Sequence, residues 1–238
     1  MTIREMHYDF KQKLNKIDSQ QYRNLRVPEI DWKLNEAIEL FIKIVSDPKF
    51  RTRLGFETSQ RIIDDIRTLV VPSEILTLSP FTGDTQIATL PDEYMFYKGS
   101  RAILLKGECS LEAEKIYLRQ HDDDSETSPF DNPSFEWREI NIRFVDNGIR
   151  IFTGSDFTVS EFAIDYVRRH PLVHNAQDFP GGTYNALDGT SLSGSQDCIL
   201  PTHTHREIVD LAVAITTGDL QISDYQIKRD KLNFNNFN

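Results

Sequence analysis

Apolar residues recur at three- and four-residue spacing in the first third of the chain, a pattern typical of amphipathic helices. The first such stripe is Ile3–Ile17. A second helix is predicted from Pro28, because the missing N–H of proline is harmless in a first helical turn. Pro48 is expected to end it, since a proline ring blocks helix continuation. A third helix is predicted over Glu57–Val70.

The helical pattern returns near the end of the chain. Thr204–Glu207 fits a capping box, in which a hydroxyl and a glutamate bond the first backbone N–H groups of a helix. Gly218 is expected to end this helix. A weak helix is predicted over Ser223–Leu232, followed by the flexible tail Asn233–Asn238.

Between these ends, apolar and polar residues alternate as in half-buried strands. Asp146-Asn147-Gly148 separates two alternating runs, and Asn-Gly in this position predicts a hairpin. The expected strands are Met95–Leu105, Glu114–Arg119, Asn141–Val145, Ile149–Phe152 and Phe162–Arg168. Two polar stretches interrupt them, the acidic His121–Pro133 and the Gly- and Ser-rich Asn175–Gln196. The second is long for an ordinary connection, which favours a functional arm over a simple loop.

The order of helices, strands and helix predicts an α+β fold. The terminal helices are expected to form one bundle, into which an antiparallel β-domain, a sandwich or barrel, is inserted. We expect residues 1–70 to be its N-terminal part and residues 71–200 to be β-rich, with an extended arm at about residues 170–198. Residues 201–238 then return to the bundle.

Composition narrows the function. The chain has 238 residues and a net charge of −10, and its longest basic cluster is Arg168-Arg169, so free binding to nucleic acid is not expected. No apolar run approaches the roughly 18–20 residues that span a bilayer. The charged N-terminus lacks the apolar core of a secretory signal, so we expect the protein to fold in the cytosol where it is made.

The sequence does not predict a catalytic site, a cofactor or a metal site. Cys109 and Cys198 belong to no CxxC pair. The acidic run at residues 122–124 lacks the ligand order of a calcium loop. Asp64 and Asp65 are expected to face solvent. A small hydrolase is the remaining enzymatic hypothesis, and it would use His203, His205 and Asp210.

Four stretches resemble a known class of proteins. Glu5–Ser19 and Pro28–Ala37 resemble the N-terminus of virion structural proteins from crAss-like phages. Leu200–Val213 is similar to the helix that closes the helical domain in tail tubular or adaptor proteins of short-tailed phages. Leu90–Tyr94 looks like the start of the β-region in the same proteins.

This resemblance implies a non-enzymatic connector protein. Such proteins commonly form twelve-fold rings below the portal, bind the portal and neighbouring rings, and line the channel through which genomic DNA passes without sequence-specific binding. The resemblance therefore implies a place in the virion after assembly in the host cytoplasm, without a membrane or a cofactor. A tail module that binds a host surface or glycan is the alternative.

The segment Glu161–Val173 and the following arm are the elements expected to contact a neighbouring subunit. Long polar arms can add strands to a neighbour or wrap it. The expected contact residues are Phe162, Tyr166, Arg168, Arg169, Pro171 and Tyr184. A surface loop without order is the alternative for the arm. Trp32 and Phe41 of the second helix are expected in the core, with an interface position as the alternative.

Overall fold

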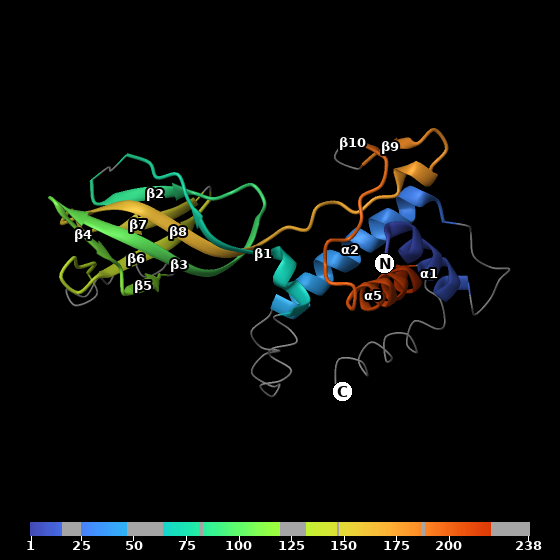
Figure 1. The fold of residues 1–238 in the computed structure, drawn as a ribbon, viewed down its shortest axis with the longest axis horizontal. Coiled ribbons are helices and arrows are strands. Elements are labelled where there is room, and N and C mark those ends of the chain that lie inside the picture. The colour runs from blue at the N-terminus through green and yellow to red at the C-terminus, as the bar shows by residue number, and fades with distance from the viewer. Residues whose placement is uncertain are drawn as a thin grey trace, which may run out of the picture. The chain divides into compact units, whose positions relative to one another are not determined.

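The computed structural model describes residues 1–15, 25–46, 64–80, 83–119, 132–146, 148–186 and 189–219. It confirms the predicted α+β fold, with helices and a separate set of strands (Figure 1). The chain divides into two compact units. The helical unit comprises Met1–Leu69 and His170–Asn238, and the β unit comprises Val70–Arg169.

The helical unit is built around its last described helix, α5. This helix packs against both α1 and α2. Its residues Ile208, Val209, Ala212 and Val213 are buried. The bounds of the helices are α1 Ile3–Asn15, α2 Val27–Ser46, the 3-10 turn η1 Arg67–Leu69 and α5 His205–Asp219. Helices from both ends of the chain therefore share one core, as the sequence pattern predicted.

Both ends of α2 and the start of α5 lie where the sequence predicted them. α2 contains Pro28 in its first turn and ends at Ser46, two residues before Pro48. α5 begins directly after Thr204, whose hydroxyl donates to the carbonyl of Pro201 at 2.9 Å. Gly218 does not end α5, which continues to Asp219. Of the predicted third helix, residues 64–70 are described: residues 64–69 are helical, whereas Val70 is the first residue of β1. The weak helix and tail after residue 219 lie outside the described residues.

The β unit is a sandwich of two four-stranded sheets, with orders β1-β8-β3-β4 and β2-β7-β6-β5. All strand pairs in these two sheets are antiparallel except β5–β6, which is parallel. The expected all-antiparallel arrangement is thus wrong for this pair. The strands are β1 Val70–Ile75, β2 Thr85–Thr89, β3 Tyr94–Lys106, β4 Cys109–Glu112, β5 Lys115–Leu118, β6 Glu139–Val145, β7 Gly148–Phe152 and β8 Thr158–Arg168.

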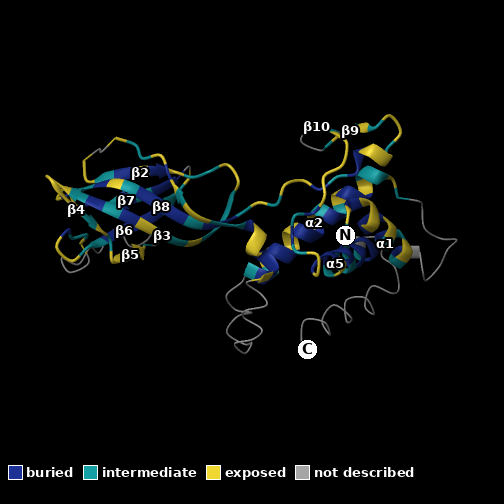
Figure 2. Cartoon of the chain, in the orientation of Figure 1, coloured by how far each residue is buried: buried dark blue, intermediate teal, exposed yellow. Residues whose placement is uncertain are grey.

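The inward faces of the two sheets form one core. Leu104 and Ile164 come from the first sheet and Ile142 and Ile151 from the second, and all are buried in the same cluster. Buried residues, dark blue in Figure 2, follow the central strands of both sheets. Gln86 of β2 links the two sheets through hydrogen bonds to Val159 of β8. Its amide oxygen accepts the N–H of Val159 at 2.7 Å, and its amide nitrogen donates to the C=O of Val159 at 3.2 Å.

The predicted hairpin is present, with Val145 of β6 opposite Gly148 of β7. The acidic stretch that precedes β6 lies mostly outside the described residues.

The arm, residues 170–198, groups with the helical unit, whereas the sequence analysis had placed it with the β-rich region. It contains the short 3-10 turn η4 (Ala176–Asp178) and the strands β9 (Thr183–Asn185) and β10 (Ser191–Ser193), which pair antiparallel with each other. The arm belongs to the helical unit because its residues form hydrogen bonds with side chains of α1 and α2.

Candidate functional site

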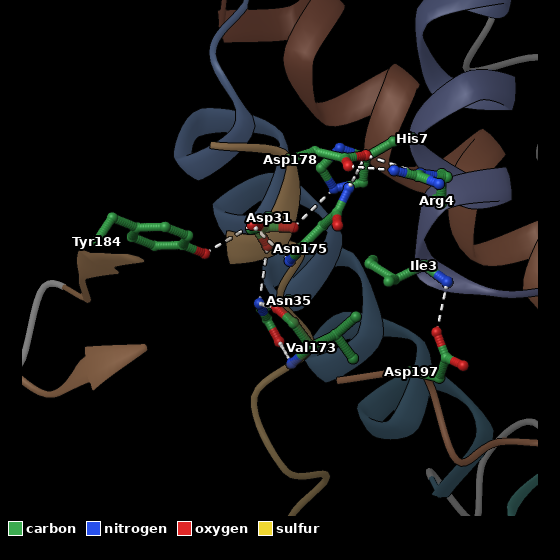
Figure 3. A network of polar contacts seen from close by, with 10 residues as sticks. All are labelled: Ile3, Arg4, His7, Asp31, Asn35, Val173, Asn175, Asp178, Tyr184 and Asp197. Carbon is green, nitrogen blue, oxygen red and sulfur yellow. Dashed lines mark hydrogen bonds and ion pairs between the residues drawn. The ribbon is translucent and has the colours of Figure 1, made fainter. Parts of the chain in front are cut away.

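A cluster of buried polar side chains in the helical unit surrounds Asp31 of α2. This side chain is buried, and a buried carboxylate is stable only with hydrogen-bond donors around it. His7 Nε2 lies 2.7 Å from Oδ1 of Asp31. The other oxygen, Oδ2, accepts the hydroxyl of Tyr184 at 2.6 Å and the backbone N–H of Asn175 at 3.1 Å. Asp31 therefore joins α1, α2 and the arm at one point (Figure 3).

Asn35 extends this contact along α2. It follows Asp31 by one helical turn, so both side chains project from the same face of the helix. Its amide oxygen accepts the N–H of Val173 at 2.9 Å, and its amide nitrogen donates to the C=O of Val173 at 2.7 Å. Both backbone groups of a buried arm residue are thus satisfied by one side chain of α2.

A second contact joins the arm to the N-terminus of α1. Arg4 Nε donates to Asp178 at 3.0 Å, and Asn175 Nδ2 donates to the same carboxylate at 2.9 Å. These hydrogen bonds, that of Arg4 first, hold the pKa of Asp178 well below its usual range. The backbone N–H of Ile3 donates to Asp197 at 2.7 Å, near the other end of the arm. The first turn of α1 is therefore bonded to the arm at two places that are far apart in the arm's sequence, Asp178 and Asp197.

The arm is also closed across its own base. His174 and Gln196 exchange backbone hydrogen bonds of 3.3 and 2.8 Å. Gln177 N–H donates to Gly194 C=O at 2.8 Å. These bonds give the described part of the arm a defined conformation, so the alternative of a loop without order does not hold for it.

Cys198 and His170 are the one cysteine–histidine contact of the described residues, with 3.5 Å between Sγ and Nε2. The same Nε2 accepts the N–H of Ile199 at 3.0 Å, which places the ring proton on Nδ1, toward the carbonyl of Pro171. Burial raises the pKa of the Cys198 thiol to about 11. A nucleophilic cysteine needs a thiolate, so this contact favours a structural role.

The residues of the hydrolase hypothesis do not converge. His203 Nε2 lies 2.7 Å from Asp65, which is buried, contrary to the expectation that Asp65 faces solvent. His205 is buried, and its ring nitrogens lie 3.1 and 2.8 Å from the carbonyl oxygens of residues 1 and 200. Asp210 pairs with Lys13 at 2.8 Å. Each of the three proposed catalytic side chains thus has its own separate partner.

Over the described ranges, no group of three or more His, Cys, Asp or Glu side chains is placed to hold a metal ion. Residues 122–124 lie outside these ranges.

The expected contact residues fall into two groups. Phe162 and Tyr166 are in the sandwich core, where the hydroxyl of Tyr166 donates to Glu74 at 2.6 Å. Burial, followed by this hydrogen bond, raises the pKa of Tyr166. These two residues are unavailable to a neighbour because both side chains are buried in the core between the two sheets.

The other contact residues are at least partly accessible. Arg169 and Pro171 are exposed, and Arg168 is half-buried, 3.7 Å from Glu93. Tyr184 is half-buried on Asp31. Its pKa is raised, first by burial and then by the bond to Asp31. Phe41 is in the core as expected, whereas Trp32 is 51% exposed.

Sequence reasoning missed His7, Asp31, Asn35 and Asn175. An acidic residue near a helix N-terminus is common because it interacts favourably with the helix dipole, so Asp31 is not conspicuous by its position alone. A usable signal was present, because Asp31 lies among the apolar residues that form the buried face of α2.

No protein-family model matches this chain, and no curated protein matches it in sequence. None of the described helices is both long enough and apolar enough to cross a membrane.

Proposed function

We propose that this chain is a structural protein of a bacteriophage virion that assembles into a ring of the head–tail connector, below the portal. The observation that carries the proposal is the anchored arm. The buried polar side chains around Asp31 hold a projecting polar element in a fixed position on the helical unit. A pre-ordered arm lowers the entropy cost of binding a neighbour.

A ring also needs a second, different surface on each subunit, since head-to-tail contacts join unlike patches. Among the described residues of the helical unit, two large aromatic side chains are exposed, Tyr8 at 68% and Trp32 at 51%. Aromatic side chains of this kind are enriched at protein interfaces. They support a helix-to-helix contact between neighbouring subunits.

The net charge of −10 is compatible with a channel wall. Because binding to duplex DNA depends on basic residues that contact phosphates, we expect the free protein not to bind DNA at physiological salt. Genomic DNA would then pass the ring without being retained.

The test compares the two tryptophans of the chain. Trp32→Ala is expected to weaken ring assembly in sedimentation velocity, because it removes an exposed aromatic residue of the helical unit. Trp137→Ala, which changes the 74% exposed tryptophan of the β unit, is the matched control and should assemble like the unaltered protein. Cryo-microscopy of purified phage particles should place the chain between portal and tail. A protein that stays monomeric and is missing from particles contradicts the proposal.

The second candidate is a tail module that binds a host surface or glycan, and Trp137 is the observation that favours it. This residue lies in a turn whose ends, Ser134 and Glu139, exchange backbone hydrogen bonds of 2.9 and 3.0 Å. The half-exposed Tyr117 lies in the same unit. Binding on a glycan array that is lost in Trp137→Ala and kept in Trp32→Ala would favour this candidate over the ring.

A further inference from the structure

The β9–β10 hairpin of the arm is a sheet of two strands, each three residues long. A two-stranded sheet is marginally stable without packing or further strands. One face is packed: Tyr184 reaches Asp31 and lies 5.7 Å from the ring of Phe179. Among the described residues, no other strand pairs with either outer edge of the hairpin.

The backbone groups at these outer edges can be assigned from the ladder. Ala186 N–H donates to Thr190 C=O, which marks a hydrogen-bonded pair. Hydrogen-bonded and non-bonded pairs alternate in antiparallel strands, so the next bonded pair is Tyr184 with Leu192. The residues between them direct their N–H and C=O groups outward. These residues are Thr183 and Asn185 on β9 and Ser191 and Ser193 on β10, and all are exposed.

The outer edges of β9 and β10 lack the features that keep a further strand from pairing with β1, another edge strand of this chain. β1, at the edge of its sheet, contains Pro72 and an irregularity between Val71 and Glu74, two features that block further pairing. β9 and β10 contain no proline, no bulge and no charged residue, although 27% of the chain is charged. Identical hairpins can therefore approach each other without repulsion between like charges in their strands.

We propose that the hairpins of neighbouring copies pair edge to edge, β10 of one copy with β9 of the next, and form one continuous sheet around the ring. This inference rests on the proposed ring. The two edges of a hairpin are different, so the pairing is head-to-tail, repeats identically and closes with the ring. The recognition is by backbone hydrogen bonds, and the partner is a second copy of this chain.

The test removes one outward N–H. Ser193→Pro deletes an edge donor and leaves the Tyr184–Leu192 pair intact, and proline is tolerated on edge strands. Ser193→Ala is the matched control, because it removes the side chain and keeps the N–H. In sedimentation velocity of the full chain, Ser193→Ala should assemble like the unaltered protein. Ser193→Pro should raise the concentration needed for half assembly about fivefold or more.

Hydrogen exchange of the unaltered protein provides a readout that needs no variant. On assembly, the amides of Thr183, Asn185, Ser191 and Ser193 should gain protection, while those of Tyr184 and Leu192 are protected already. Equal exchange of the four edge amides in free and assembled protein overturns the pairing. So does protection that arises only in whole particles, which would identify a different partner protein.

The outcomes separate the two proposals. If the unaltered protein assembles and Ser193→Pro assembles equally well, the edge pairing is wrong and the ring stands. If the unaltered protein neither assembles nor occurs in particles, the ring fails, and the edge pairing fails with it.

Discussion

Asp31 shows how one residue determines the position of a whole segment. Its carboxylate is surrounded by donors from α1 and from the arm, and none of these donors would be satisfied by an apolar side chain. Removing one partner from such a buried group costs more than the bond itself is worth, because the remaining groups stay buried and unpaired. The contact is therefore specific for an acid at this position.

Asp31→Asn should destabilise the helical unit by about 3 kcal/mol. The carboxylate has two acceptor oxygens, whereas the amide has one acceptor oxygen and one NH2 donor that would face the donors of the arm or of His7. Tyr184→Phe removes one donor and should cost about 1.5 kcal/mol. Urea unfolding followed by far-ultraviolet circular dichroism measures both changes. Tyr8→Phe, at an exposed position of α1, is the control and should change stability by less than about 0.5 kcal/mol. Equal stability of all three variants would contradict the importance of the cluster.

Tyr166 and Tyr184 should resist ionisation at high pH. Burial and acidic partners raise the pKa values of Tyr166 and Tyr184 above the ordinary value of about 10. A group with a raised folded-state pKa contributes its full stability below its unfolded pKa and loses it as pH rises toward the folded value. Stability should therefore fall above about pH 10. Ultraviolet titration should show a late phenolate phase that coincides with unfolding and is smaller in Tyr184→Phe. A single phase near the ordinary value would contradict this.

The sequence allowed the α2 residues of the polar cluster to be recognised, but not their partners in the arm. Asp31 and Asn35 are polar positions next to an apolar helix face, which a periodicity analysis can flag. The arm partners of Asp31 are Asn175 and Tyr184, which lie 144 and 153 residues from it along the chain. The arm partner of Asn35 is Val173, at a separation of 138 residues. Local patterns carry no information on pairing at such separations. The sequence therefore shows that Asp31 and Asn35 are unusual polar positions, but it does not show which residues they contact.

At the scale of elements, alternation was a reliable guide where strands are joined by a short turn. The β6–β7 hairpin was predicted on that basis, whereas β3 was predicted from its content of aromatic and β-branched residues. β2 and β4, five and four residues long, were missed. The equally short β5 and β7 were predicted, because β5 alternates clearly and β7 is joined to β6 by the Asn-Gly turn. The parallel pairing of β5 with β6 was missed because strand direction depends on the path of the intervening chain, which alternation does not encode.

Gly148 has a role that the turn signal did not reveal. It lies in β7, where an added Cβ would sit 2.3 Å from the carbonyl oxygen of Ala88 in β2. Gly148→Ala should therefore separate β2 from β7 and cost about 3 kcal/mol. Gly99→Ala in β3 is the matched control, because its Cβ would meet only Asp165 Oδ2 at 3.5 Å, an ordinary contact. Thermal unfolding measures the difference, and equal effects of the two substitutions would contradict this explanation.

At the scale of the molecule, the β unit is inserted into the helical unit through strands that lie side by side. Val70, its first residue, pairs with Val167, close to its last residue. An insertion whose ends are adjacent can be removed without stretching the remaining chain.

A shortened chain, in which a Gly-Ser linker replaces Val70–Arg169, should keep the helices and the anchored arm. Val70–Arg169 alone should unfold cooperatively, because its core residues all belong to it. Circular dichroism and urea unfolding of both pieces provide the measurement. Failure of the shortened chain to fold would show that the helical unit depends on the insertion.

The discontinuity of the helical unit also sets an order of events on the ribosome. The β unit is one uninterrupted stretch and can fold as soon as it emerges. α1 and α2 are synthesised earlier but must wait for α5, which begins only at His205. At about 5–20 residues per second, the roughly 50 residues between the end of the β unit and the end of α5 take about 3–10 seconds to synthesise. During that interval the apolar faces of α1 and α2 are open to chaperones. The helical unit therefore finishes folding after the β unit, although its first two helices precede the β unit in the chain.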